Sequence, residues 1–271
     1  MRAQAHGSST LPRGTMTLFD SIILGIIEGL TEFLPISSTA HLVLASKLLH
    51  LRTSDFLKSF EISIQLGAIA SIVFLYWKTL ILKWDLNAKI ITAFVPTAII
   101  GLIFYKLVKN VLLENYLISV YALFFGGIAL VVFELLHQEK ESDTKELTDI
   151  SYKQAVAIGL FQSISIIPGV SRAAATILGG MLMGMKRKTI VEFSFLLAIP
   201  TMVGAISLDL IKSADTFSQT DFIYLGTGFL VSFIMAIVSV KFLLKFVQNH
   251  RLTSFGIYRI MLALTFLFLL G

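Results

Sequence analysis

Cysteine is absent from this chain of 271 residues, and charged residues are scarce. The absence of cysteine excludes disulfides, catalysis by a thiolate and metal sites with cysteine ligands. Only 14% of the residues are Asp, Glu, Lys or Arg, whereas 56% are hydrophobic and the mean hydropathy is +0.84. A soluble domain of this length needs far more charge to cover its surface, so a soluble fold is excluded as well.

Long apolar runs are abundant, and several reach the roughly 20 residues that span a bilayer. The chain is therefore predicted to be an all-α polytopic membrane protein, surrounded by membrane lipids. The net charge of +5 comes from Lys and Arg in short connections without a basic stripe of interleaved aromatics, which excludes nucleic acid as a partner. The apolar segments are 17–34, 36–50, 59–77, 88–107, 115–137, 153–167, 170–184, 189–212, 221–247 and 253–270.

The first fifteen residues, MRAQAHGSSTLPRGT, are polar and lack the apolar region of a signal peptide. We interpret residues 1–15 as a disordered extension or a remnant of cloning. Residues 16–271 are predicted to form a single integral-membrane domain.

Short apolar segments come in pairs, and a proline break joins each pair. Segments 36–50, 153–167 and 170–184 are too short to cross a bilayer, and 17–34 is marginal. The breaks are Pro35 and Pro168–Gly169, and proline removes a backbone donor and disfavours helix in the residue before it. We predict two re-entrant helical hairpins together with about six transmembrane helices.

The two hairpins also resemble each other in sequence. Ser37 aligns with Ser171 and Ser38 with Arg172 at an offset of 134, and Glu61 aligns with Glu192 at an offset of 131. The predicted repeat halves are roughly 16–137 and 150–271. Because three full spans separate the hairpins, the halves have inverted topology, an arrangement that builds binding sites near the membrane midplane.

Lys and Arg residues are concentrated in the connections on one face, which the positive-inside rule makes cytoplasmic. The first hairpin is then predicted to enter from the outer face and the second from the cytoplasm.

Glu28 and Glu32 lie four residues apart, so both carboxylates face one direction on a helix. Two uncompensated carboxylates in a low dielectric repel each other, and a hard divalent cation such as Mg²⁺ or Ca²⁺ resolves the repulsion. Two alternatives are a protonated, neutral pair and a salt bridge with Arg172.

New helices are predicted to start after both breaks, at Ser37, Ser38 and Thr39 and at Ser171 and Arg172. Helix N-termini present free N–H groups that suit phosphate, and hydroxyls there either cap the helix or contact phosphate. His41 lies three residues after Ser38, on the same helical face, where it can take a proton from the hydroxyl or from water.

Arg172 lies in an apolar stretch, where a charge costs at least about 2.5–3.5 kcal/mol and usually serves a function. Its fork of donors matches phosphate oxygens, although a structural pairing with Glu28 or Glu32 is the alternative. Thr176 lies one turn further, on the same face.

The segments EGLTEFLPISSTAHL (28–42) and PGVSRAAAT (168–176) together resemble the undecaprenyl-diphosphate phosphatase family of the bacitracin-resistance type. The resemblance covers essentially Met16 to Gly271. It implies an enzyme of the bacterial inner membrane that hydrolyses undecaprenyl diphosphate at a site open to the periplasmic face. The product is the lipid monophosphate that carries cell-wall precursors.

The resemblance also implies roles for single residues. Glu28 and Glu32 match the acidic motif linked to a divalent metal, Ser38 the hydroxyl proposed as nucleophile and His41 its proposed helper. Arg172, Ser171 and Thr176 match the motif thought to hold the diphosphate. Ala40 and Ala173 depart from the family, which usually has Gly and Ser there.

The competing class is a transporter, in particular a polyprenyl-phosphate flippase using the same midplane site. Inverted repeats, broken helices and midplane charge serve a carrier equally well. A homodimer is left open by the sequence.

Overall fold

The computed structural model describes residues 16–52, 54–108, 112, 116–140, 143–210 and 219–270, so the N-terminal segment 1–15 lies outside the described residues. The helices are α1 Leu18–Thr31, α2 Ser38–Leu48, α3 Asp55–Leu82, α4 Trp84–Leu107, α5 Tyr116–Leu136, η2 Leu147–Asp149, α6 Tyr152–Ser163, η3 Ile164–Ile166, α7 Arg172–Leu182, α8 Arg187–Leu210, α9 Gln219–Asn249 and α10 Thr253–Leu270.

Among the described residues, five helices are long and apolar enough to cross a membrane, namely α3, α4, α5, α8 and α9. The expected sixth, α10, is apolar but falls in the shorter class over Thr253–Phe268. Large apolar side chains such as Trp84, Ile103 and Phe268 point outward and are exposed. A water-soluble protein does not expose so many, whereas a bilayer accommodates them, so the chain is a multi-pass all-α membrane protein.

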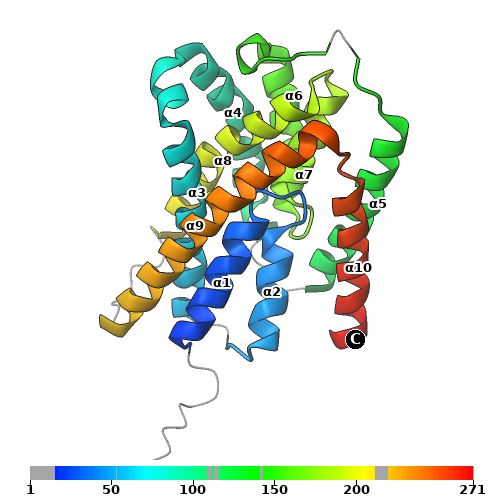
Figure 1. Cartoon of the computed structure of the whole chain (residues 1–271). Helices are drawn as coiled ribbons and strands as arrows, with labels where there is room; N and C mark the ends of the chain where they lie inside the picture. Colours follow the sequence, from blue (N-terminus) through cyan, green and yellow to red (C-terminus); the bar gives the residue numbers. More distant parts are fainter. Residues whose placement is uncertain are drawn as a thin grey trace, which may run out of the picture.

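Both predicted hairpins are present, and they approach each other from opposite ends of the molecule. Figure 1 shows α1 and α2 side by side in the lower half, and α6 and α7 in the upper half. The second helix of each hairpin starts directly after a serine with positive φ, 70° at Ser37 and 73° at Ser171. These serines are the pair aligned by the repeat, so the halves share a rare backbone conformation as well as sequence.

Equivalent helices of the two halves make equivalent contacts. Helix α1 packs against α9, and α6 packs against α4, in both cases through glycine. A Cβ added at Gly29 would lie 2.4 Å from the Ser232 carbonyl oxygen, and one at Gly159 would lie 2.0 Å from the Ala93 carbonyl oxygen. The glycines therefore let each hairpin helix pack closely against a long helix.

Replacing Gly159 with alanine is expected to destabilise the protein by roughly 1–3 kcal/mol, because the new methyl group overlaps the backbone of α4. Thermal unfolding in detergent measures the change as a lower Tm. Gly226→Ala on α9 is the matched control, since a Cβ there meets nothing within 4 Å among the described residues. That control is expected to be neutral or stabilising by up to about 1 kcal/mol. Equal Tm values for the two variants would contradict the close packing.

Candidate functional site

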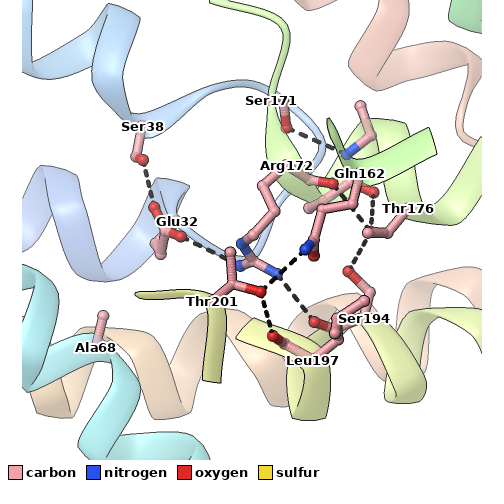
Figure 2. Close-up of polar contacts among 12 residues, drawn as sticks. Glu32, Ser38, Ala68, Gln162, Ser171, Arg172, Thr176, Ser194, Leu197 and Thr201 are labelled. Carbon is pink, nitrogen blue, oxygen red and sulfur yellow. Dashed lines mark hydrogen bonds and ion pairs between the residues drawn. The ribbon is translucent and has the colours of Figure 1, made fainter. Parts of the chain in front are cut away.

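An ion pair joins the two hairpins at their broken ends. Arg172, the first residue of α7, places Nη2 3.2 Å from Oε1 of Glu32, which follows α1. Both side chains are largely buried, with relative exposures of 10% and 9%. Figure 2 shows the guanidinium between Glu32 on one side and α8 on the other. Of the alternatives that the sequence left open, the structure shows the salt bridge, and Glu32 rather than Glu28 is the partner of Arg172.

The same carboxylate also receives the hydroxyl of the first hairpin. Ser38, at the start of α2, donates from Oγ to Glu32 Oε2 at 2.5 Å (Figure 2). Glu32 thus bridges a hydroxyl from one repeat half and a cation from the other. A carboxylate that accepts from a serine can take its proton when that serine attacks, so the arrangement suits nucleophilic catalysis.

Arg172 is held in place from the side of α8. Its Nη1 donates to the carbonyl oxygen of Ser194 at 2.9 Å, and its Cζ lies 5.9 Å from the centre of the Phe33 ring. Thr176 is fully buried, and its Oγ1 lies 2.6 Å from Ser194 Oγ and 2.9 Å from the Arg172 carbonyl oxygen. These contacts fix the α7 terminus against α8, which gives Thr176 a supporting position behind the guanidinium.

Some buried polar atoms of the site have no hydrogen-bond partner among the described residues. Among the described residues, both carboxylate oxygens of Glu28 and Nε of Arg172 are buried without a hydrogen-bond partner. Glu28 lies within electrostatic range of Glu32, Glu61 and Arg172. Buried groups of this kind are nearly always satisfied in a working protein, so a ligand that brings both positive charge and acceptor oxygens fits here.

His41 does not face Ser38. Its Nδ1 lies 2.7 Å from the carbonyl oxygen of Ser37, and its Nε2 lies 2.7 Å from the hydroxyl of Tyr258 on α10. Because a carbonyl only accepts, Nδ1 carries the hydrogen and Nε2 accepts from Tyr258. The expected Ser38–His41 contact is therefore absent from this arrangement, since the Ser38 side chain turns back to Glu32 instead.

The remaining hydroxyls of the predicted site differ in their surroundings. Ser171 caps α7, with its Oγ accepting from the backbone N–H of Ala174 at 3.2 Å. Ser37 makes no such side-chain cap on α2 although its backbone conformation is similar, and Thr39 is exposed. Substrate binding by Ser37, Thr39 and Ser171 stays a prediction. Of the two buried serines that precede α2 and α7, only Ser37 does not use its hydroxyl to cap the helix.

The model of the family described as "Bacitracin resistance protein BacA" matches residues 21–265. The chain belongs to the BacA family. A relative from Aquifex aeolicus (strain VF5), named undecaprenyl-diphosphatase, is 49% identical over 251 residues, covering 93% of this chain and 98% of the relative. Relatives from Sulfurihydrogenibium sp. (strain YO3AOP1) and Wolinella succinogenes carry the same name and are each 48% identical over 251 and 255 residues. These two alignments cover 93% and 94% of this chain and 98% and 99% of the relatives.

Three side chains that contact the two hairpins of this BacA-family protein were not among the predicted site residues. Ser194 and Tyr258 carry no charge and lie in apolar helices, so only the packing reveals them. Arg259 did give a signal, because it is the only charged residue in the apolar segment 253–270. An intramembrane charge is a functional hypothesis by default, and the rule that singled out Arg172 applies to Arg259 as well.

Proposed function

We propose that this member of the BacA family hydrolyses undecaprenyl diphosphate to undecaprenyl phosphate and inorganic phosphate. The observation that carries the proposal is the bridge from Ser38 through Glu32 to Arg172, which brings a hydroxyl, its proton acceptor and a phosphate-binding cation together. The relatives named as undecaprenyl-diphosphatases support the choice of substrate. The alternative of a flippase has no support from those names.

In the proposed reaction Ser38 Oγ attacks the terminal phosphorus of the diphosphate. Its proton passes to Glu32 Oε2, to which the hydroxyl already donates. The bond from the terminal phosphorus to the bridging oxygen breaks, and the lipid monophosphate leaves with that oxygen. Water then hydrolyses the phosphoserine and releases phosphate. Arg172, whose Nε–H has no partner among the described residues, stabilises the charge on the transferring group.

Glu28 and Glu32 are the side chains that would hold a divalent cation, Mg²⁺ or Ca²⁺. Their oxygen-only donor set fits such an ion, and the two unpartnered oxygens of Glu28 support this assignment. The described residues contain no group of three or more His, Asp or Glu side chains arranged around a metal. Substrate phosphate and water would complete the coordination, and the bound ion would neutralise phosphate charge.

We also propose that the protein lies in the bacterial inner membrane, with the α1–α2 hairpin entering from the periplasmic face. The connections after α3, α5 and α9 lie in the upper half of the molecule in Figure 1. By sequence these connections include Lys83, Lys140 and Arg251. Their common location supports a cytoplasmic assignment of that end. The diphosphate headgroup then reaches Ser38 from outside, while the prenyl chain stays in lipid.

Phosphate release from undecaprenyl diphosphate by the detergent-purified protein tests the function. Wild-type protein is expected to release phosphate. This release is expected to stop when EDTA is added and to resume when Mg²⁺ or Ca²⁺ is supplied. Glu32→Gln is expected to lower kcat by about 10²–10⁴-fold, because the neutral amide cannot take the Ser38 proton and binds a divalent cation more weakly than a carboxylate does.

Glu192→Gln on α8 is the matched control, since this carboxylate faces Lys188 outside the site and its loss is expected to leave kcat unchanged. A detergent micelle has no two membrane faces between which a lipid could be moved. Phosphate release in detergent therefore separates hydrolysis from transport. A well-folded wild-type protein that releases no phosphate, yet moves the lipid between leaflets of a vesicle, would establish the flippase.

A further inference from the structure

Arg259 is a fully buried charge that the reaction described above does not use. It lies in the middle of α10, and within the described residues every hydrogen bond of its guanidinium goes to a backbone carbonyl. Nη1 donates to Pro35 at 3.3 Å, while Nη2 donates to Gly169 at 3.1 Å and to Ala122 at 3.2 Å. Nε donates to Leu123 at 3.3 Å. A buried cation held by carbonyls is costly, so a function for it is expected.

Two of these carbonyls occupy equivalent places in the repeat. Pro35 and Gly169 are separated by 134 residues, the offset that aligns the two halves. Each lies two residues before the serine with positive φ, Ser37 or Ser171. A single guanidinium therefore contacts the broken turn of both hairpins. Strained backbone of this kind persists only where the surroundings hold it, and Arg259 supplies such a hold on both turns.

Helix α5 is shaped to receive the guanidinium. A Cβ added at Gly126 would lie 2.1 Å from Nη2 of Arg259, so the absence of a side chain at this position makes the space. The carbonyls of Ala122 and Leu123, one turn earlier on α5, accept from the same group. Arg259 is thereby fixed against α5 while it reaches both turns, which makes α5 and α10 a common support for the two hairpins.

We propose that Arg259 is a positioning residue that locks the two hairpin turns together and so aligns Ser38 with Arg172. Both of these residues lie three positions after a carbonyl that Arg259 binds, at the starts of α2 and α7. Phosphoryl transfer depends on placement within fractions of an ångström, and a shift of about 1 Å costs on the order of 100-fold in rate. A lysine cannot replace this clamp, because its donors radiate from one atom whereas the planar guanidinium spans both turns.

The alignment part of the proposal rests on the proposed phosphatase, whereas the clamp itself is tested without activity. The chain has no cysteine, so Leu48→Cys on α2 and Leu182→Cys on α7 provide two unique sites for spin labels. Both positions are exposed. In Arg259→Lys and Arg259→Gln the distance distribution between the labels is expected to broaden. In the same backgrounds without labels, kcat is expected to fall by about 100-fold while KM stays within about threefold.

Arg251→Gln is the control, because Arg251 also donates to a carbonyl, that of Glu134, but lies in the connection before α10. It is expected to leave the distances and kcat unchanged. If the Arg259 variants do not fold, Gly126→Ala replaces them, since it displaces the guanidinium and keeps its charge; the same broadening and loss of kcat are expected. A narrow, wild-type distance distribution in a folded variant would overturn the clamp. If the wild-type protein releases no phosphate while the Arg259 variants still show broadened distances, the result would refute the proposed phosphatase and leave the clamp in place.

Discussion

Replacing Arg172 with alanine is expected to lower the rate of phosphate release by about 10³–10⁵-fold, the range found when an arginine at a transferring phosphoryl group is lost. Its Nη1 and Nη2 are held by Ser194 and Glu32, so the fork is oriented before substrate arrives. Its Nε–H is buried and lacks a partner among the described residues, and we expect it to donate to a phosphate oxygen of the bound substrate. Single-turnover and steady-state release by the purified variant measure the loss.

The variant Arg172→Lys tests the contribution of the positive charge apart from that of the forked guanidinium donors. We expect lysine to restore a small part of the rate, because it brings a positive charge but cannot contact Glu32, Ser194 and phosphate at once. Thermal unfolding of each variant shows whether the fold is kept. If folded Arg172→Ala keeps an activity within tenfold of wild type, Arg172 takes no part in the reaction. Its role would then be only the structural ion pair with Glu32.

Replacing Ser38 with alanine is expected to abolish turnover, with a loss of at least about 10⁴-fold, because it removes the proposed nucleophile. The wild-type enzyme, quenched with acid during turnover of substrate labelled in the terminal phosphate, is expected to carry label on Ser38. Peptide mapping locates that label. The Ser38→Ala variant is expected to carry none.

Ser46→Ala on the same helix is the matched control, since the Ser46 hydroxyl is buried without a partner among the described residues and lies two turns away. Its loss is expected to leave turnover unchanged. A Ser38→Ala enzyme that keeps a substantial rate would make water the attacking group and Ser38 a ligand of the phosphate.

Features that depend on local chemistry could be predicted from the sequence. Proline at each break predicted the hairpins, because it stops a helix whatever surrounds it. The repeat predicted that Ser37 and Ser171 are equivalent, and their φ values agree. The charge of Arg172 in an apolar segment indicated either a phosphate or a carboxylate as its partner, and the structure shows the pairing with Glu32 that the sequence gave as the alternative.

Features that depend on long-range packing could not be predicted. Helical spacing placed His41 near Ser38. It does not reveal that Tyr258, near the end of the chain, forms a hydrogen bond with the imidazole of His41. The choice between Glu28 and Glu32 as partner of Arg172 depends on how α1 ends, because Glu32 already belongs to the turn. Backbone carbonyls that hold Arg259 and Arg172 leave no trace in side-chain patterns.

The nearly equal φ angles of Ser37 and Ser171 have a consequence for evolution. The next residue differs between the halves, Ser38 in one and Arg172 in the other. A duplicated ancestor with perfect two-fold symmetry would have faced serine with serine or arginine with arginine across its centre, and two arginines there repel each other. Divergence at this position gives the two halves different chemical roles, so substitutions that make this position alike in both halves are expected to be selected against.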